Sequence, residues 1–443
     1  MEVYNRLKDE KKRSPPPVST DWRSVLDDWV RTEVDLSRYH NRTRQDREEL
    51  AQRLLAAAVR EGAAEDQAKD IARQMAAELA GYGPIQPLLD DPSITEIMVN
   101  GPGQIWVERQ GLIRKADIVF RDMGHLKKMV ERIVAPTGRR VDEASPYVDL
   151  RLPDGSRVNI IISPVSLLGP VVTIRRFPEK VFTVEDMITT GALTEKMADF
   201  LRVCVAGKLS SIVSGGTGSG KTTTLNVISG FIPSGERIIT VEDAAELRLP
   251  HEHVVPLEAR PANMEGRGEV TIRSLVRNAL RMRPDRIIIG EVRGGEALDM
   301  LQAMNTGHDG SLGTIHANSE VDAISRLETA VILGSAELPL QVIRAQIGSA
   351  VRLIIQQARL RDGSRKIVGI SEVFPREGNV GLRKLCQFVP HGLDDEGRIL
   401  GNFVWTGEKP AFLGRLADLG IELGGEYFAS AGGFSDAQSA PEF

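Results

Sequence analysis

The spacing of apolar side chains changes along the 443-residue chain and divides it into regions of different character. Between residues 21 and 79, apolar positions such as Leu50, Leu54 and Val59 recur at near-helical intervals, which predicts amphipathic helices. Residues 1–20 are charged and then proline-rich, with too little apolar surface to fold alone. The chain is therefore predicted to begin with a disordered tail followed by a helical module.

Short β-rich runs characterise residues 80–180. The runs "ITEIMVN", "QIWVER", "VNIIIS" and "VVTIRR" are separated by glycine, proline and Asp-Gly turns, and one helical stretch lies near residues 124–135. This pattern predicts a small α+β domain. A proline leads out of it, and we expect residues 181–186 to form a linker into the next helix.

Apolar strands and helices alternate in residues 187–420. The strands "LSSIVS", "RIITVED" and "RIIIGE" are joined by helical stretches such as "IRSLVRNALRMR". Alternation of this kind implies right-handed crossovers and a mostly parallel sheet, so the fold class is α/β. A hairpin turning near Asp362-Gly363 could extend the sheet edge. Residues 421–443 are small and polar, and we expect a flexible tail there.

Composition narrows the function. The formal net charge is −5, which argues against a dedicated nucleic-acid binder. Only Cys204 and Cys386 occur, so a disulfide framework or a tetracysteine zinc site is impossible. No apolar run approaches the roughly 20 residues needed to cross a bilayer. We therefore expect a cytoplasmic protein whose contact with a membrane is peripheral and made through a partner.

A glycine-rich stretch, "SGGTGSGKTTTLN", follows the first of these strands. Gly215, Gly220, Lys221 and Thr222 match the pattern G-x-x-x-x-G-K-[ST] of a P-loop, with an apolar strand before it and a helix-forming run after it. Glycines let backbone N–H groups approach phosphate oxygens, the lysine meets the terminal phosphates, and the threonine binds Mg²⁺. The predicted ATP-binding residues are Gly215, Gly216, Thr217, Gly218, Ser219, Gly220, Lys221, Thr222 and Thr223.

Acidic and histidine residues further along fit a hydrolytic site. Glu242 ends one apolar strand and Glu291 lies near the end of another. One carboxylate would orient or deprotonate the attacking water, and Glu291 with Thr222 would hold Mg²⁺, although the assignment of base and metal ligand between the two glutamates stays open. His308 and His316 are candidates to sense the γ-phosphate.

Taken together, these motifs resemble the secretion ATPase superfamily that powers type II and type IV secretion and type IV pili. The order and spacing are most similar to the CpaF-type ATPases of Flp (tight adherence) pilus assembly, on "RPANMEGRGEVTIRSLVRNALRMRPDRIIIGEVRGGEALDMLQAMNTGHDGSLGTIHANS" and "DLRLPDGSRVNIIISPVSLLGPVVTIRRF". The resemblance covers residues 80–410. The lack of a tetracysteine module makes the type II secretion and pilus extension branches a poorer match.

The resemblance implies a RecA-like ATPase domain preceded by the smaller domain. It also implies a homo-hexameric ring that contacts a platform protein at the cytoplasmic face of the inner membrane. Arginines of the smaller domain would meet the nucleotide phosphates, and the match falls on Arg157 and Arg175, with Arg140, Arg151 and Arg176 as further candidates.

Three other functions remain in view. The nearest is an ATPase of a type IV secretion system. A nucleotide-gated scaffold that hardly hydrolyses ATP is disfavoured, because it would have no chemical need for Glu242, Glu291 and both histidines. A helicase or DNA translocase is disfavoured by the acidic balance and the lack of interleaved basic and aromatic residues.

Overall fold

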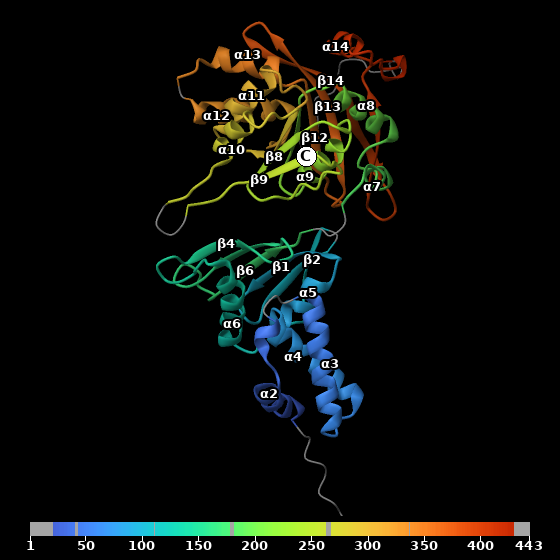
Figure 1. Cartoon of the computed structure of the whole chain (residues 1–443). Coiled ribbons are helices and arrows are strands. Elements are labelled where there is room, and N and C mark those ends of the chain that lie inside the picture. The colour runs from blue at the N-terminus through green and yellow to red at the C-terminus, as the bar shows by residue number, and fades with distance from the viewer. Residues whose placement is uncertain are drawn as a thin grey trace, which may run out of the picture. The chain divides into compact units, whose positions relative to one another are not determined.

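The structure is a computed structural model that describes residues 21–39, 43–109, 111–177, 181–262, 267–335 and 337–428. The chain divides into two compact units, unit 1 (residues 1–179) and unit 2 (residues 180–443), which are coloured along the chain in Figure 1. The tail predicted at residues 1–20 lies outside the described residues.

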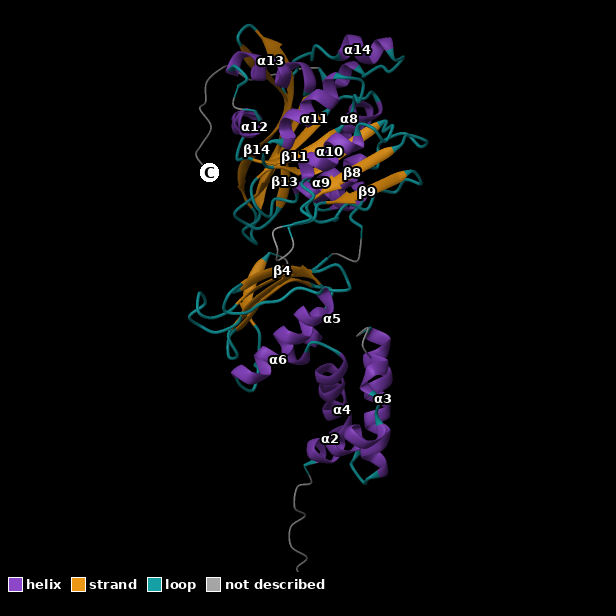
Figure 2. Cartoon of the chain, turned by 60° about the vertical axis from the view of Figure 1, so that its left-hand side comes forward, coloured by secondary structure: helices purple, strands orange, loops and turns teal. Residues whose placement is uncertain are grey.

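Helices make up the first part of unit 1. They are α2 (Trp22–Glu33), η2 (Leu36–Tyr39), α3 (Arg44–Arg60) and α4 (Glu65–Ala80). The start of α3 is fixed by a capping box, in which Thr43 accepts from the backbone N–H of Asp46 while the Asp46 carboxylate accepts from that of Thr43. Helices α3 and α4 pack side by side (Figure 2) and share a core that includes Leu50, Leu54 and Met75.

A six-stranded antiparallel sheet follows, in the order β3-β2-β1-β6-β5-β4. Its elements are η3 (Gly83–Ile85), α5 (Gln86–Asp90), β1 (Ile94–Asn100), β2 (Ile105–Arg109), β3 (Leu112–Lys115), α6 (Met123–Val134), η4 (Ala135–Thr137), β4 (Tyr147–Arg151), β5 (Arg157–Ile161) and β6 (Val171–Arg175). Burial alternates along the inner strands, as a sheet covered on one face requires. The buried face packs on α6 through residues such as Ile97, Ile160 and Leu126.

Unit 2 contains a nine-stranded sheet in the order β15-β14-β13-β12-β7-β11-β10-β8-β9. The strands are β7 (Ser211–Gly215), β8 (Ile238–Glu242), β9 (Val254–Glu258), β10 (Arg286–Val292), β11 (Leu312–His316), β12 (Leu353–Arg359), β13 (Arg365–Arg376), β14 (Asn379–Leu393) and β15 (Ile399–Trp405). Neighbours from β12 to β9 are parallel, and β13 to β15 extend the sheet in antiparallel fashion. The mixed, mostly parallel sheet confirms the predicted α/β fold class.

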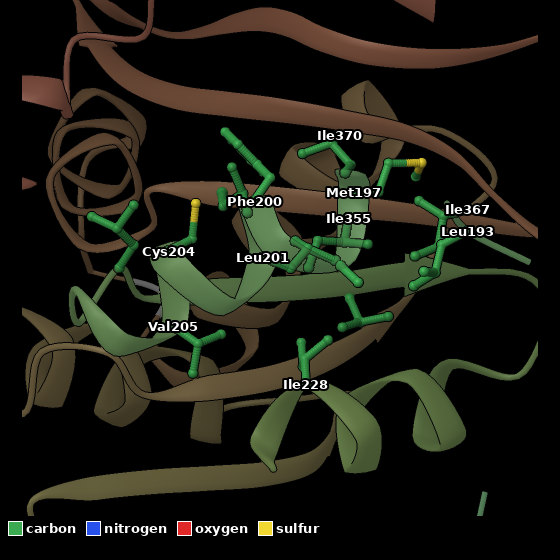
Figure 3. Close-up of a cluster of buried hydrophobic side chains, with 14 of the residues drawn as sticks. Leu193, Met197, Phe200, Leu201, Cys204, Val205, Ile228, Ile355, Ile367 and Ile370 are labelled. Carbon is green, nitrogen blue, oxygen red and sulfur yellow. The ribbon is translucent and has the colours of Figure 1, made fainter. Parts of the chain in front are cut away.

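Helices cover both faces of this sheet (Figure 1). They are α7 (Val184–Thr189), α8 (Glu195–Ala206), α9 (Lys221–Ser229), α10 (Ile272–Ala279), α11 (Glu296–Asn305), α12 (Glu320–Gly334), α13 (Leu340–Ala350), α14 (Leu413–Asp418) and η5 (Gly425–Tyr427). Val213 points into a core formed with α8 and α9, part of which is shown in Figure 3, and its neighbour Ile212 points into a core formed with α10 to α13. Burial on both faces explains why β7 and β8 are apolar runs without alternation.

Two boundaries differ from the sequence-based expectation. Helix α7 begins inside the range expected to be a linker, because Thr183 and Asp186 form a capping box. Residues 421–428 were expected to belong to a flexible tail, but Tyr427 is buried and its ring lies 5.7 Å from that of Phe200 and 5.2 Å from that of Trp405. These residues complete the core on the α8 side of the sheet; residues 429–443 lie outside the described part.

Candidate nucleotide-binding site

The glycine-rich loop joins β7 to α9, so it is a strand-loop-helix turn. Gly218 and Gly220 have φ angles of 69° and 94°, in the left-handed region that favours glycine. Gly215 is restricted by packing, because a Cβ added there would lie 2.4 Å from the Gln357 carbonyl oxygen. The loop therefore requires glycine at these positions, for backbone conformation at two of them and for close packing at the third.

Polar side chains gather on the inside of the loop. The Lys221 ammonium donates to the Gly216 carbonyl at 3.0 Å, and the Ser219 hydroxyl donates to the same carbonyl at 2.9 Å. Thr222 is in the first turn of α9, where backbone N–H groups lack partners within the helix. A helix N-terminus beside a lysine favours a phosphate group.

The register of the parallel strands brings the candidate catalytic residues to one edge. His316 lies directly opposite Gly215 in the pairing of β11 with β7, and its Nε2 is 3.3 Å from the Thr217 hydroxyl. Glu291 is near the carboxyl end of β10, and Glu242 is at the carboxyl end of β8. Because β7, β11, β10 and β8 are consecutive neighbours in a parallel sheet, all these residues lie on the P-loop side of the sheet.

Glu242 is held in place by the protein. The residue is only 3% exposed, and its Oε2 accepts hydrogen bonds from the backbone N–H groups of Glu246 at 2.8 Å and Leu247 at 3.1 Å. A Cβ at Gly290 would lie 2.9 Å from the Glu242 Cγ, so glycine there leaves room for the glutamate. Glu242 is therefore a buried carboxylate in a fixed position.

Glu291 has a more exposed and more cationic environment. Its Oε2 accepts from Arg293 Nη2 at 2.7 Å. Burial raises the pKa of Glu291, but the hydrogen bond and charge of Arg293, together with the charge of Lys221, outweigh burial and bring the pKa below its ordinary value. Glu291 is thus an ionised carboxylate that lies close to Lys221 and can offer its oxygens to a metal ion.

His316 has a lowered pKa, first because it is partly buried and then because Lys221 is close. A lowered pKa keeps the imidazole neutral near pH 7, so one ring nitrogen can donate and the other can accept. His316 can therefore form a hydrogen bond to a group bound in the loop without carrying a charge.

His308 does not join this group. It precedes Leu312, which pairs with Ser211 at the opposite end of β7 from the loop. Its backbone N–H donates to Ala303, and its carbonyl accepts from the Ser311 hydroxyl at 2.7 Å. Of the two histidines predicted to sense the γ-phosphate, the structure therefore brings only His316 to this loop, because the whole length of β11 separates the two.

The candidate arginines of unit 1 divide into two groups. Arg157 lies opposite Arg151 on β4 and opposite Arg175 on β6, so the three occupy one row across the sheet, the arginine row. Like charges directly opposite each other are unfavourable, and such a row is suited to an anion. Arg176 instead donates to the carbonyls of Asp91 and Ile94, a structural role. Arg140 is also outside the row and contacts Asp142 at 3.1 Å.

The hairpin of β12 and β13 supplies residues that sequence reasoning missed. Arg365 donates to the carbonyl of Gly218 at 2.9 Å, and the Thr224 hydroxyl donates to the Gln357 side chain at 2.6 Å. The signal was present in "LIIQQARL", where two glutamines interrupt an otherwise apolar strand. Only the pairing of β12 with β7 shows that these residues support the P-loop.

The donor set suits Mg²⁺. Thr222 and Glu291 offer a hydroxyl and a carboxylate, the hard oxygen ligands that Mg²⁺ prefers, and Asp243 adds a second carboxylate nearby. In the part of the chain that the structure describes, no group of three or more His, Cys, Asp or Glu side chains could hold a metal ion. A Mg²⁺ ion here would need phosphate oxygens as further ligands, as is usual for nucleotide sites.

Known proteins are similar to this chain in sequence and in fold. The family described as "Type II/IV secretion system protein" matches residues 78–375. A Mycobacterium tuberculosis protein provisionally named a conjugal transfer protein is 38% identical over 314 residues, 70% of this chain and 89% of its own length. The type IV secretion system protein PtlH of Bordetella pertussis is 33% identical over 325 residues, 66% of this chain and 94% of its own.

A crystal structure of the pilus retraction motor PilT with bound ADP shares the fold, with a TM-score of 0.50 and 22% identity over 66% of this chain and 82% of that one. The family match covers well over half of the chain and includes the P-loop, both glutamates and His316. The chain therefore belongs to the type II/IV secretion system protein family, and it is an ATPase.

Proposed function

We propose that this ATPase is a homo-hexameric, Mg²⁺-dependent motor of a secretion machine of the type IV secretion or conjugal transfer class. The observation that carries the proposal is the convergence of the P-loop, Glu242, Glu291 and His316 at one edge of the parallel sheet. The class of machine is supported by the names of the relatives, which refer to conjugal transfer and type IV secretion. They give no support to the narrower expectation of Flp pilus assembly.

The residues divide the work of hydrolysis by position. Lys221 and the backbone N–H groups of the loop bind and orient the phosphates. Thr222 and Glu291 would hold Mg²⁺, which neutralises phosphate charge when bound. Glu242, fixed by two backbone N–H groups, accepts a proton from the attacking water or orients it, and His316 forms a hydrogen bond to the γ-phosphate.

The arginine row is proposed to bind nucleotide phosphates from unit 1. Guanidinium groups match phosphate oxygens well, and adjacent positive charges become favourable when an anion lies between them. A charge that reaches the phosphates only in one arrangement of the two units would couple hydrolysis to motion.

We propose that the partners are further copies of this chain and a platform protein at the inner membrane, and that the ATPase acts from the cytoplasmic side. Among the described residues, no helix is long and apolar enough to span a bilayer. The net charge of −5 favours protein over nucleic-acid partners.

The test is the steady-state ATPase rate as a function of protein concentration, with light scattering to follow assembly. We expect the rate per chain to rise as a ring forms and to collapse in Glu291→Gln. Tight ATP binding without assembly-dependent turnover would contradict the motor and favour a nucleotide-gated scaffold. The matched control is Glu328→Gln, because Glu328 pairs with Arg344 at 2.7 Å on α12 and α13, away from the loop.

A further inference from the structure

We propose that Arg293 is a positioning residue that acts as an internal cation for Glu291 and Asp243, and that Mg²⁺ with nucleotide must displace its guanidinium before Glu291 can serve the metal. The inference rests on the proposed function, in which Glu291 is a metal ligand. It adds a competitor for the metal position, built into the chain itself.

One arginine joins the acidic ends of two strands. Arg293 Nη2 donates to Glu291 Oε2 at 2.7 Å, and Arg293 Nη1 lies 3.5 Å from Asp243 Oδ2. Glu291 lies on β10 and Asp243 directly follows β8, its parallel neighbour. The guanidinium therefore stands where a cation would bind to both carboxylates.

The backbone that carries Arg293 is fixed while its side chain is not enclosed. The N–H groups of Arg293 and Gly294 donate to Glu296 Oε1 at 2.6 and 2.7 Å, and Glu296 is itself buried. By contrast, the Arg293 side chain is 62% exposed. Displacement of the guanidinium therefore needs only side-chain rotation, with the loop unchanged.

Charge makes the guanidinium and a divalent cation mutually exclusive at one carboxylate oxygen. Two cations a few ångströms apart repel each other, and Lys221 already adds positive charge close to Glu291. When the guanidinium is present, it also relieves the repulsion between Glu291 and Asp243. When phosphates arrive with Mg²⁺, their negative charge favours the metal over the arginine.

The consequence is a fixed order of binding at this site. Without nucleotide, the charge of the two carboxylates is partly neutralised by Arg293, which lowers their tendency to bind free Mg²⁺. With nucleotide, the metal replaces the guanidinium, which becomes available for the phosphates or solvent. Arg293 thus raises the Mg²⁺ concentration that the nucleotide complex requires.

The experiment measures how the binding of a fluorescent ADP analogue to the full chain depends on the Mg²⁺ concentration. It compares wild type, Arg293→Ala and Arg293→Lys. Because an exposed ion pair contributes about 0.2–1 kcal/mol, we expect Arg293→Ala to lower the half-saturating Mg²⁺ concentration by about 1.4- to fivefold. Arg293→Lys, which keeps a charge but loses the planar fork, should fall between the two. Thermal melting verifies that each variant is folded.

Arg277→Ala is the matched control. Arg277 has similar side-chain exposure, 59%, and donates to Asp299 at 2.7 Å, but Asp299 keeps Arg273 as a second partner. We expect no change in its Mg²⁺ dependence. An unchanged or higher Mg²⁺ requirement in Arg293→Ala overturns the inference.

Glu291→Gln separates this failure from a failure of the proposed function. If that variant raises the Mg²⁺ requirement while Arg293→Ala does not lower it, Glu291 serves the metal and only the role of Arg293 is wrong. If Glu291→Gln leaves the Mg²⁺ requirement unchanged, the metal assignment is wrong, and the inference about Arg293 is overturned with it.

Discussion

The sheets of the two units carry their charged residues in different ways. In unit 2, β7 and β8 are buried on both faces, and the one charged residue in these two strands is Glu242 at the end of β8. In unit 1, the inner strands are buried on one face only, and charged residues lie on the other, where Arg151, Arg157 and Arg175 form the arginine row.

This difference follows from the direction of the strands. Parallel strands place all their carboxyl ends at one edge, so that edge collects Gly215, Glu242, Glu291 and His316 from distant parts of the sequence. Antiparallel strands alternate in direction, so residues that act together gather along a row across one face. The two units thus build charged sites by two different geometric rules.

The largest expected effect tests whether the residues gathered at one edge of the parallel sheet carry out hydrolysis. Glu242→Gln keeps the size of the side chain and removes its charge, so ATP should still bind while kcat falls roughly 10²–10⁴-fold. Single-turnover hydrolysis and equilibrium binding of ATP measure the two quantities separately. Glu246→Gln is the control, because only the backbone N–H of that residue contacts Glu242 in the hydrogen bond described above. A kcat near that of wild type would remove Glu242 from the chemical step.

The next effect concerns binding at the same edge. Lys221→Ala removes a charged hydrogen-bond donor, and ATP affinity should fall about 10- to 100-fold, as expected for the loss of a charge-assisted hydrogen bond. Isothermal titration calorimetry measures the ATP affinity. Lys208→Ala, which removes a lysine paired with Glu236 at the opposite edge, should bind ATP as wild type does. Equal affinity in both variants would contradict the P-loop assignment.

A smaller effect tests whether the arginine row of unit 1 binds phosphate. Arg157→Ala removes the central charge of the arginine row, so turnover should fall by roughly tenfold if the row binds phosphate. The steady-state ATPase rate measures this effect, and thermal melting verifies that the variant is folded.

Arg109→Ala is a suitable control for that variant, since Arg109 pairs with Asp91 at 2.7 Å and lies outside the row. Its ATPase rate should match wild type. A loss of stability in Arg157→Ala without any loss of turnover would make the row a structural feature, and the contrast between the two sheets would lose its functional meaning.

The smallest effect is a pH dependence at His316. Its folded-state pKa is lowered, so the unfolded chain, with an ordinary histidine pKa of about 6.5, binds the proton first as the pH falls. The stability contribution of this group is therefore complete above about pH 6.5 and is lost as the pH falls toward the lowered value. Between about pH 7.5 and pH 5.5, wild type should lose slightly more melting temperature than His316→Gln. An equal loss in both proteins would show that burial and Lys221 do not shift His316.

Much of unit 2 could be predicted because its signals are local. The P-loop is a contiguous run whose conformation depends on its own glycines, and the apolar strands can be recognised individually. The mostly parallel sheet then follows from the alternation of strands and helices. Glu242 and Glu291 were found because each stands at the end of such a strand.

The rest depended on register and on contacts between distant residues. His308 and His316 are only eight positions apart in the sequence, yet β11 places them at opposite edges, which spacing alone does not reveal. Gln357 and Arg365 support the P-loop from more than 130 residues away, as their hydrogen bonds show. Arg293 was not singled out, because its partner Asp243 follows a different strand, β8. Each of these required knowledge of which strands are neighbours.

The packing of Tyr427 against Phe200 has a consequence for synthesis of the protein. Phe200 belongs to the second helix of unit 2, whereas Tyr427 is among its last described residues. The ribosome must therefore release almost the entire polypeptide before this aromatic contact can form, and long-range contacts of this kind slow folding. Unit 1 has its own cores and is complete before unit 2 has been translated. A nascent chain that stalls shortly before Tyr427 would leave exposed the parts of Phe200 and Trp405 that Tyr427 covers, and it would be a target for chaperones.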